Sequence, residues 1–163
     1  MAILTNLAHN KWLSSFVNEV NTKKVERIEG RLNFEIKYTS YFSKMPFFFK
    51  KSNGDSNIDN LFKLKSNIDK ILIKDSILTV FKEVKNNFNI KTIGVDYNNN
   101  NIFFWIELKS DSIHQENQLK KILEQKNKTL NKASISLRYI IVSESIGLEL
   151  PPDYVNIKIY NGH

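Results

Sequence analysis

Several residue types that mark particular functions are scarce or absent in this chain of 163 residues. There is no cysteine, which excludes disulfides and thiolate-bound metals. The three histidines, His9, His114 and His163, lie far apart in the sequence and do not have the spacing of zinc ligands. The five glycines are isolated from one another, so no glycine-rich loop could cradle a phosphate.

Long apolar runs are also missing. The longest have four or five residues, far fewer than a bilayer-spanning helix needs. The first residues lack the basic flank and long apolar stretch of a signal peptide. We therefore expect a cytoplasmic protein with no membrane partner.

What the chain has in excess is positive charge. Lysine and arginine number 24 against 17 acidic residues, which leaves a formal net charge of +7. Such a field favours anionic partners, with nucleic acid first among them. The alternative is compositional, because lysine here accompanies abundant asparagine and isoleucine, and lysine-rich surfaces are often only solvated. The hydrophobic fraction of 41% is typical of a globular protein, and the length suits one domain over residues 1–163.

Hydrophobic periodicity predicts the elements of the first half. Helical spacing indicates a helix over about residues 9–22. Apolar and polar residues alternate over 31–38, which predicts an amphipathic strand. The run Met45–Phe49 contains a proline and reads as a short edge strand, followed by a loop at 50–56. Helical spacing returns at 58–72, and a separate helix is expected from about Ser76, a plausible N-cap.

The second half has clearer patterns. We predict strands over 92–97 and 102–109 joined by a turn at Asn98–Asn101, because asparagine tolerates left-handed backbone angles. A charged helix over about 113–132 follows, and then strands over 135–143 and 155–160. This order predicts an α+β fold, with a mixed, largely antiparallel sheet and helices packed on it.

One strand carries residues that could support chemistry. Along 102–109 the even positions are all apolar and must face a core. Glu107 and Lys109 are on the other face, two residues apart, and Asp96 lies upstream. An aspartate followed at a distance by Glu-x-Lys resembles the PD-(D/E)XK nuclease superfamily, over about residues 76–160. Val95 stands where that family usually has a proline.

The resemblance implies a metal-dependent nuclease. Asp96 and Glu107 would hold Mg²⁺, which neutralises the charge that develops during phosphodiester cleavage and activates a water. Lys109 would orient or polarise that water and, with Glu107, form the catalytic pair. Glu83, on the helix before the first strand, would be a further acidic ligand. Gln118 and Lys121 lie where the family often has accessory polar residues.

The predicted register tests this interpretation. A tight turn at Asn98–Asn101 pairs Asp96 with Phe103, four residues from Glu107, or roughly 13 Å along the strand. Two acids that share one cation must be much closer, so a bulge or an asymmetric loop would have to shift the register. In the alternative interpretation, Glu107 and Lys109 are a solvent-facing pair and Asp96 flanks the turn.

Other residues could bind nucleic acid. Lysines outnumber acids on the predicted helix 113–132, and Lys120, Lys121 and Lys128 are our candidates for phosphate contacts. A solvated helix face would look the same. Phe103 and Trp105 could stack on bases, although such aromatic residues are more often covered by a helix.

A second class of function is a non-enzymatic bacterial interaction protein of the immunity, anti-defence or adaptor type. Its partner would be another protein or a second copy of the chain. The residues Phe47–Phe49, followed by two lysines, could form an exposed contact patch for it, or else a core strand or dimer seam.

Overall fold

The computed structural model describes residues 11–43 and 55–159, with side chains for 11–35 and 66–159. The chain divides into two compact units, one of residues 1–23 and 77–163 and the other of residues 24–76. The assignment of all 163 residues to a single domain stays a prediction. No described helix is both long enough and apolar enough to span a bilayer. The elements are α2 (Lys11–Thr22), α3 (Val25–Ser43), α4 (Asp55–Asn87), β1 (Ile90–Asn98), β2 (Asn101–Leu108), α5 (Ile113–Asn131), β3 (Ser136–Ser143), the 3₁₀ turn η2 (Glu144–Ile146) and β4 (Val155–Ile157).

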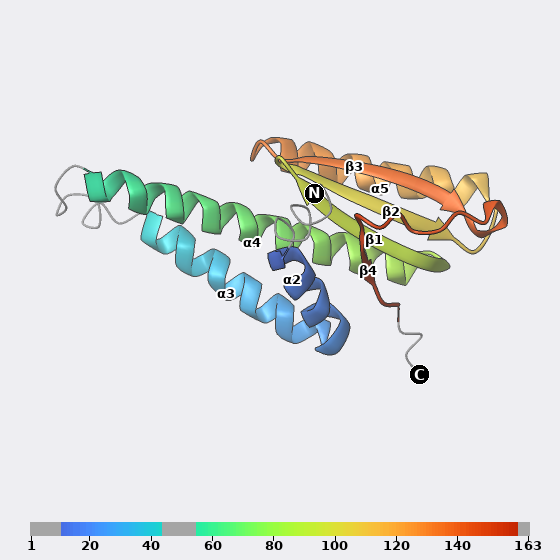
Figure 1. Cartoon of the computed structure of the whole chain (residues 1–163), viewed down its shortest axis with the longest axis horizontal. Helices are drawn as coiled ribbons and strands as arrows, with labels where there is room; N and C mark the ends of the chain where they lie inside the picture. The colour runs from blue at the N-terminus through green and yellow to red at the C-terminus, as the bar shows by residue number, and fades with distance from the viewer. Residues whose placement is uncertain (1–10, 44–54, 160–163) are drawn as a thin grey trace. The chain divides into compact units, whose positions relative to one another are not determined.

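The first unit is built on a four-stranded sheet with the order β3-β2-β1-β4 (Figure 1). β1 pairs antiparallel with β2 and β4, whereas β2 and β3 are parallel. The parallel pair requires a crossover connection, which α5 supplies. The α+β class and the mixed, largely antiparallel sheet predicted from the sequence are confirmed.

The β1–β2 hairpin is as tight as its asparagines indicated. Asn98 pairs with Asn101, which leaves a two-residue loop. Asn99 and Asn100 both have positive φ, 49° and 62°, as a type I′ turn requires. Asparagine adopts this backbone region at low cost, so the turn chemistry sets the register of the hairpin.

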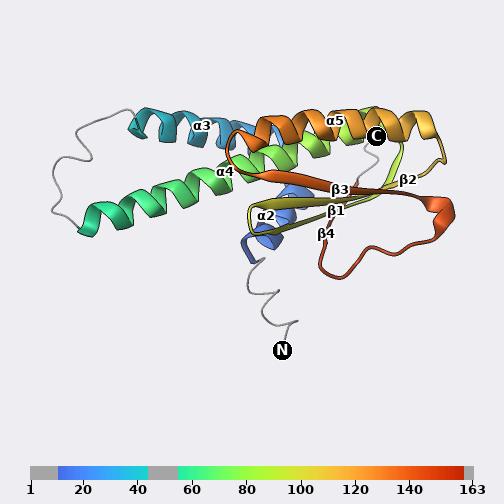
Figure 2. The same ribbon diagram turned by 90° about the horizontal axis from the view of Figure 1, so that it is seen from above.

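The two faces of the sheet have different covers. Helices cover the face of the sheet that carries Phe104. Tyr139, which pairs with Phe104 and shares its face, donates a hydrogen bond to Glu124 of α5. On the same face, Trp12 of α2 packs edge-on against Tyr97. Residues 144–154 cross the opposite face, and Figure 2 shows α5 and this connection on opposite sides of the strands. The core lies between helices and sheet, and its most buried side chains in this unit include Leu13, Phe16, Ile77, Leu78, Ile93, Ile102, Phe104, Ile106 and Leu119.

An asparagine side chain lies at each edge of the sheet. Asn21 of α2 donates to the carbonyl oxygen of Asn156 and accepts from the N–H of Lys158, along the β4 edge. Asn127 of α5 accepts from the N–H of Leu137 at 2.8 Å, at the start of β3. Amide side chains thus satisfy backbone groups that a bare sheet edge would leave open to another chain.

The strand predicted over residues 31–38 is wrong, because these residues belong to α3. Ile28 and Leu32, four residues apart, are 1% and 0% exposed, whereas Phe34 is 67% exposed. The alternation had placed Leu32 and Phe34 on one face. The helical spacing of Ile28 and Leu32 decides instead, since one turn of helix puts both on a single buried side.

The separate helix expected from Ser76 is also wrong, because α4 runs unbroken from Asp55 to Asn87. Ser76 is not an N-cap. Its hydroxyl donates to the carbonyl oxygen of Leu72 at 2.7 Å, which lets serine sit inside a helix. The predicted edge strand Met45–Phe49, its alternative roles, and residues 50–54 of the predicted loop lie outside the described residues. The last two residues of that loop, 55 and 56, instead begin α4.

Candidate functional site

The register separates the two acids of the predicted metal site. Asp96 pairs with Phe103 and Glu107 pairs with Thr92, with no irregularity between them. Four residues of strand therefore lie between Asp96 and Glu107, which is roughly 13 Å. A bulge does occur in β1, between Ile90 and Thr92, but it lies beyond the pairing of Glu107 and cannot bring Asp96 closer.

Glu107 has a partner that the sequence did not suggest. Its side chain is buried, and Lys91 at the bulge lies with Nζ 3.6 Å from Glu107 Oε1 and 3.3 Å from Glu144 Oε1. The hydrogen bond to Glu144 and the negative charge of Glu107 raise the pKa of Lys91. Lys109 is exposed, one residue past the end of β2. The alternative interpretation of Glu107 as solvent-facing is wrong, because residues 144–154 lie over its side of the sheet.

Glu83 lies in the helical layer. It forms an ion pair with Lys126 of α5 at 3.7 Å, on the side of the sheet opposite to Glu107. Within residues 11–35 and 66–159, no three acidic or histidine side chains gather where they could hold a metal ion. Asp96, Glu107 and Glu83 thus do not form the ligand set that Mg²⁺ would need. The roles predicted for Asp96 and Glu83 as metal ligands, and for Glu107 as a metal ligand and catalytic residue, stay predictions.

The face that carries Glu107 is closed by the connection between β3 and β4. A Cβ atom at Gly94 would overlap Leu150 Cδ1 and lie 3.1 Å from Tyr154 Cβ, so this connection packs directly on the bare glycine. Tyr154 also contacts Trp105, with ring centroids 6.2 Å apart, and burial raises the pKa of Tyr154. Trp105 is 6% exposed. It is covered by an irregular segment, not by the helix we expected, and it cannot stack on a base in this conformation.

The lysines predicted to contact phosphates fall into two groups on α5. Lys120 donates to Glu116 at 2.7 Å, and this hydrogen bond raises the pKa of Lys120. Its charge is therefore already balanced within the helix. Lys121 and Lys128 are exposed on a different side, seven residues or two helical turns apart.

Around Lys121 and Lys128 the exposed side of α5 is polar, and its one acidic residue is Glu124, which accepts a hydrogen bond from Tyr139. Spacings of three and four residues place a row of side chains along one side of a helix. We call this row the α5 stripe; all its members are exposed, and they are His114, Gln118, Lys121, Gln125, Lys128 and Lys132. From Lys121 to Lys132, the C-cap residue, the stripe extends about 16 Å. The sequence had singled out Lys121, Lys128 and Gln118; helical spacing adds Lys132.

No family model, curated protein or solved structure matches this chain. The resemblance to PD-(D/E)XK nucleases therefore rests on the motif residues alone.

Proposed function

We propose that this chain binds nucleic acid by its phosphate backbone, through the α5 stripe. The observation that carries the proposal is the segregation of charge on α5. Between Ile113 and Lys132 there are five lysines and two glutamates. Both glutamates have partners off the stripe: Glu116 binds Lys120, and Glu124 accepts from Tyr139. The stripe thus has three lysines against the single carboxylate of Glu124, which already accepts a hydrogen bond from Tyr139.

The side chains of the stripe suit phosphate and sugar contacts. Lysine ammonium groups neutralise phosphates, and glutamine amides donate to phosphate and sugar oxygens. Such contacts do not distinguish one base from another, so the affinity should depend weakly on base sequence and strongly on salt concentration. Measured along the duplex axis, the stripe spans the rise of about five phosphates of one strand, at 3.4 Å per phosphate.

Cleavage is not part of the proposal. A hydrolytic metal site would need Asp96 and Glu107 together, and their strand positions are four residues apart. Binding without chemistry requires only the stripe.

The test is an equilibrium titration of labelled oligonucleotides against the intact protein, with duplex DNA, single-stranded DNA and single-stranded RNA in separate arms. The informative variant is Lys121→Gln/Lys128→Gln. Its matched control is Lys11→Gln/Lys23→Gln, which removes the same charge from the first residue of α2 and the residue after its end. α2 lies beside β4, at the opposite edge of the sheet from β3.

For the wild type we expect a dissociation constant of about 10⁻⁴ to 10⁻⁶ M at physiological salt, the range of non-specific binding. The stripe variant should bind at least about 10-fold more weakly, and the control should stay within about twofold of the wild type. Equal losses in the two variants would mean that net charge alone governs binding, and the stripe would have no specific role.

A further inference from the structure

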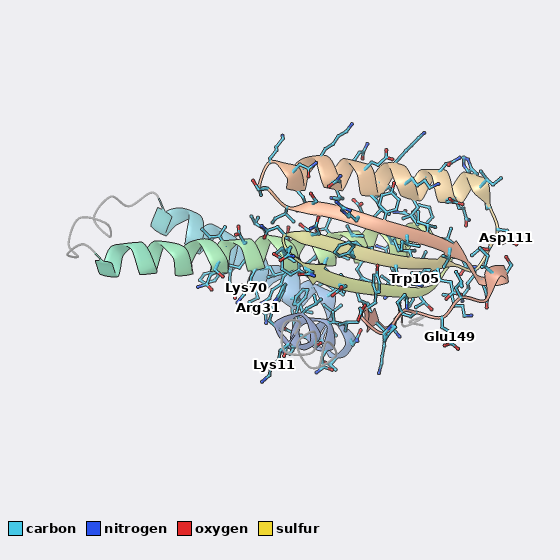
Figure 3. All side chains as sticks on the ribbon, turned by 45° about the horizontal axis from the view of Figure 1, so that its top comes forward. Lys11, Arg31, Lys70, Trp105, Asp111 and Glu149 are labelled. Carbon is cyan, nitrogen blue, oxygen red and sulfur yellow. The ribbon has the colours of Figure 1, made fainter. Side chains whose placement is uncertain are left out.

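A second surface lies where β2 and β3 end. Three large aliphatic side chains are unusually exposed there: Ile113 by 74%, Ile146 by 61% and Leu148 by 49%. Ser145 donates a hydrogen bond of 2.6 Å to Asp111, which joins η2 to the start of α5. Each of the three aliphatic residues is at most three positions along the chain from Ser145 or Asp111. Figure 3 shows Asp111 at this end of the sheet. We call Ile113, Ile146 and Leu148 the aliphatic patch.

The backbone beneath the patch is held in place. Gly147 has φ 70°, and its N–H donates to the carbonyl oxygen of Glu144, which closes the turn between Ile146 and Leu148. Lys91 binds Glu144 on one side, and Leu150 packs over Gly94 on the other. A surface fixed before binding loses little conformational entropy when a partner docks.

The charge around the patch identifies the chemistry of its partner. Residues 143–149, which carry Ile146 and Leu148, contain Glu144 and Glu149 and no basic residue, in a chain whose net charge is +7. The basic side chains at this end of the sheet are Lys91, which binds Glu144, and Lys109, which is exposed after β2. Asp111 adds a third acid beside Ser145. Two copies meeting patch to patch would bring these acids together, which repulsion opposes. A partner with cationic residues around an apolar centre would complement both features.

We propose that the aliphatic patch binds a separate protein through a surface that is apolar at its centre and rimmed by lysine or arginine. The patch shares no residue with the α5 stripe, so this site is independent of nucleic-acid binding. It provides the kind of contact that a non-enzymatic interaction protein would use, at residues other than Phe47–Phe49.

The test is selection of a displayed library of random peptides on the intact protein, with counter-selection on Ile146→Ser/Leu148→Ser. The enriched peptides should combine aliphatic residues with lysine or arginine. A chosen peptide should bind the double variant at least about 10-fold more weakly. Glu149→Lys, a change at an exposed position that leaves the patch intact, should weaken binding several-fold. Lys121→Gln/Lys128→Gln should bind the peptide as the wild type does, which separates this result from that for nucleic acid.

Three results would overturn the proposal. One is the absence of peptides that prefer the wild type over the double variant. Another is enrichment of acidic or uncharged peptides. The third is a dimer in sedimentation equilibrium that Ile146→Ser/Leu148→Ser dissociates, because the occupant would then be a second copy of the chain. Circular dichroism of each variant confirms that these surface changes leave the fold intact.

Discussion

Replacing Gly94 by alanine tests how residues 144–154 close the sheet. A methyl group at this position would overlap Leu150 Cδ1 and approach Tyr154 Cβ to 3.1 Å. Leu150 can turn aside, but the Cβ of Tyr154 moves only with its backbone. The segment must therefore shift away from β1, and the indole of Trp105 beneath Tyr154 should become more exposed.

The magnitude follows from two opposing effects. Overpacking of a filled site costs about 1–3 kcal/mol. Gly94 does not have a left-handed backbone conformation, so alanine can adopt its backbone angles. Because alanine also lowers the conformational entropy of the unfolded chain, it stabilises the fold by about 0.4–1 kcal/mol. The free energy of unfolding should fall by about 0–2.6 kcal/mol, against the roughly 5–15 kcal/mol of a typical domain.

Urea denaturation, followed by tryptophan fluorescence and by far-ultraviolet circular dichroism, measures this change. Gly30→Ala is the matched control, because a Cβ at Gly30 would meet nothing within 4 Å and the residue lies inside α3. It should raise stability by about 0.5–1 kcal/mol, the usual gain for alanine over glycine in a helix. If Gly94→Ala were as stable as the wild type with unchanged fluorescence, residues 144–154 would not pack on β1 as described.

Three further predictions concern ionisable groups on and beside this face. With millimolar Mg²⁺, we expect the wild type and Glu107→Ala to show the same background level of oligonucleotide cleavage. Magnesium-dependent cleavage by the wild type that is lost in Glu107→Ala would instead support the nuclease interpretation. Hydrogen bonds from Ser143 and Ser145 lower the pKa of Asp111. The stability that the ionised Asp111 contributes is therefore present above the unfolded pKa of about 3.8 and is lost as pH falls through the folded pKa. Asp111→Asn should flatten the acid limb of a stability–pH curve below about pH 4, and an unchanged limb would argue against these hydrogen bonds. The raised pKa of Lys91 acts in the opposite sense: the stability that the charged Lys91 contributes is present below about pH 10.5 and is lost as pH rises further. In the same titration, Lys91→Met should remove this loss of stability at alkaline pH.

The elements that the sequence predicted well are those defined by local signals. The asparagine turn sets the β1–β2 register, and with it the four-residue offset between Asp96 and Glu107. Residues 113–132 were correct as a helix because their apolar spacing is helical and Ser112 provides an N-cap to Gln115.

The errors arose where two patterns competed or where distant segments met. Over residues 31–38 the alternation of apolar residues resembled a strand, although Ile28 and Leu32 have helical spacing and are the buried pair. The burial of Glu107 depends on residues 144–154 and on Lys91 at a bulge, and neither is visible within the strand itself. A residue's face can be read from its strand, but what covers that face comes from elsewhere in the chain.

The central claim, that three lysines of the α5 stripe contact phosphates, is tested most directly by the salt dependence of duplex DNA binding. Each neutralised phosphate contributes about −0.9 to the slope of log K against log salt concentration, so the wild type should give about −2.7. Lys121→Gln/Lys128→Gln should reduce the slope to about −0.9, while Lys11→Gln/Lys23→Gln leaves it unchanged. A slope that is the same in the wild type and the stripe variant, or that falls equally in both variants, would contradict the account.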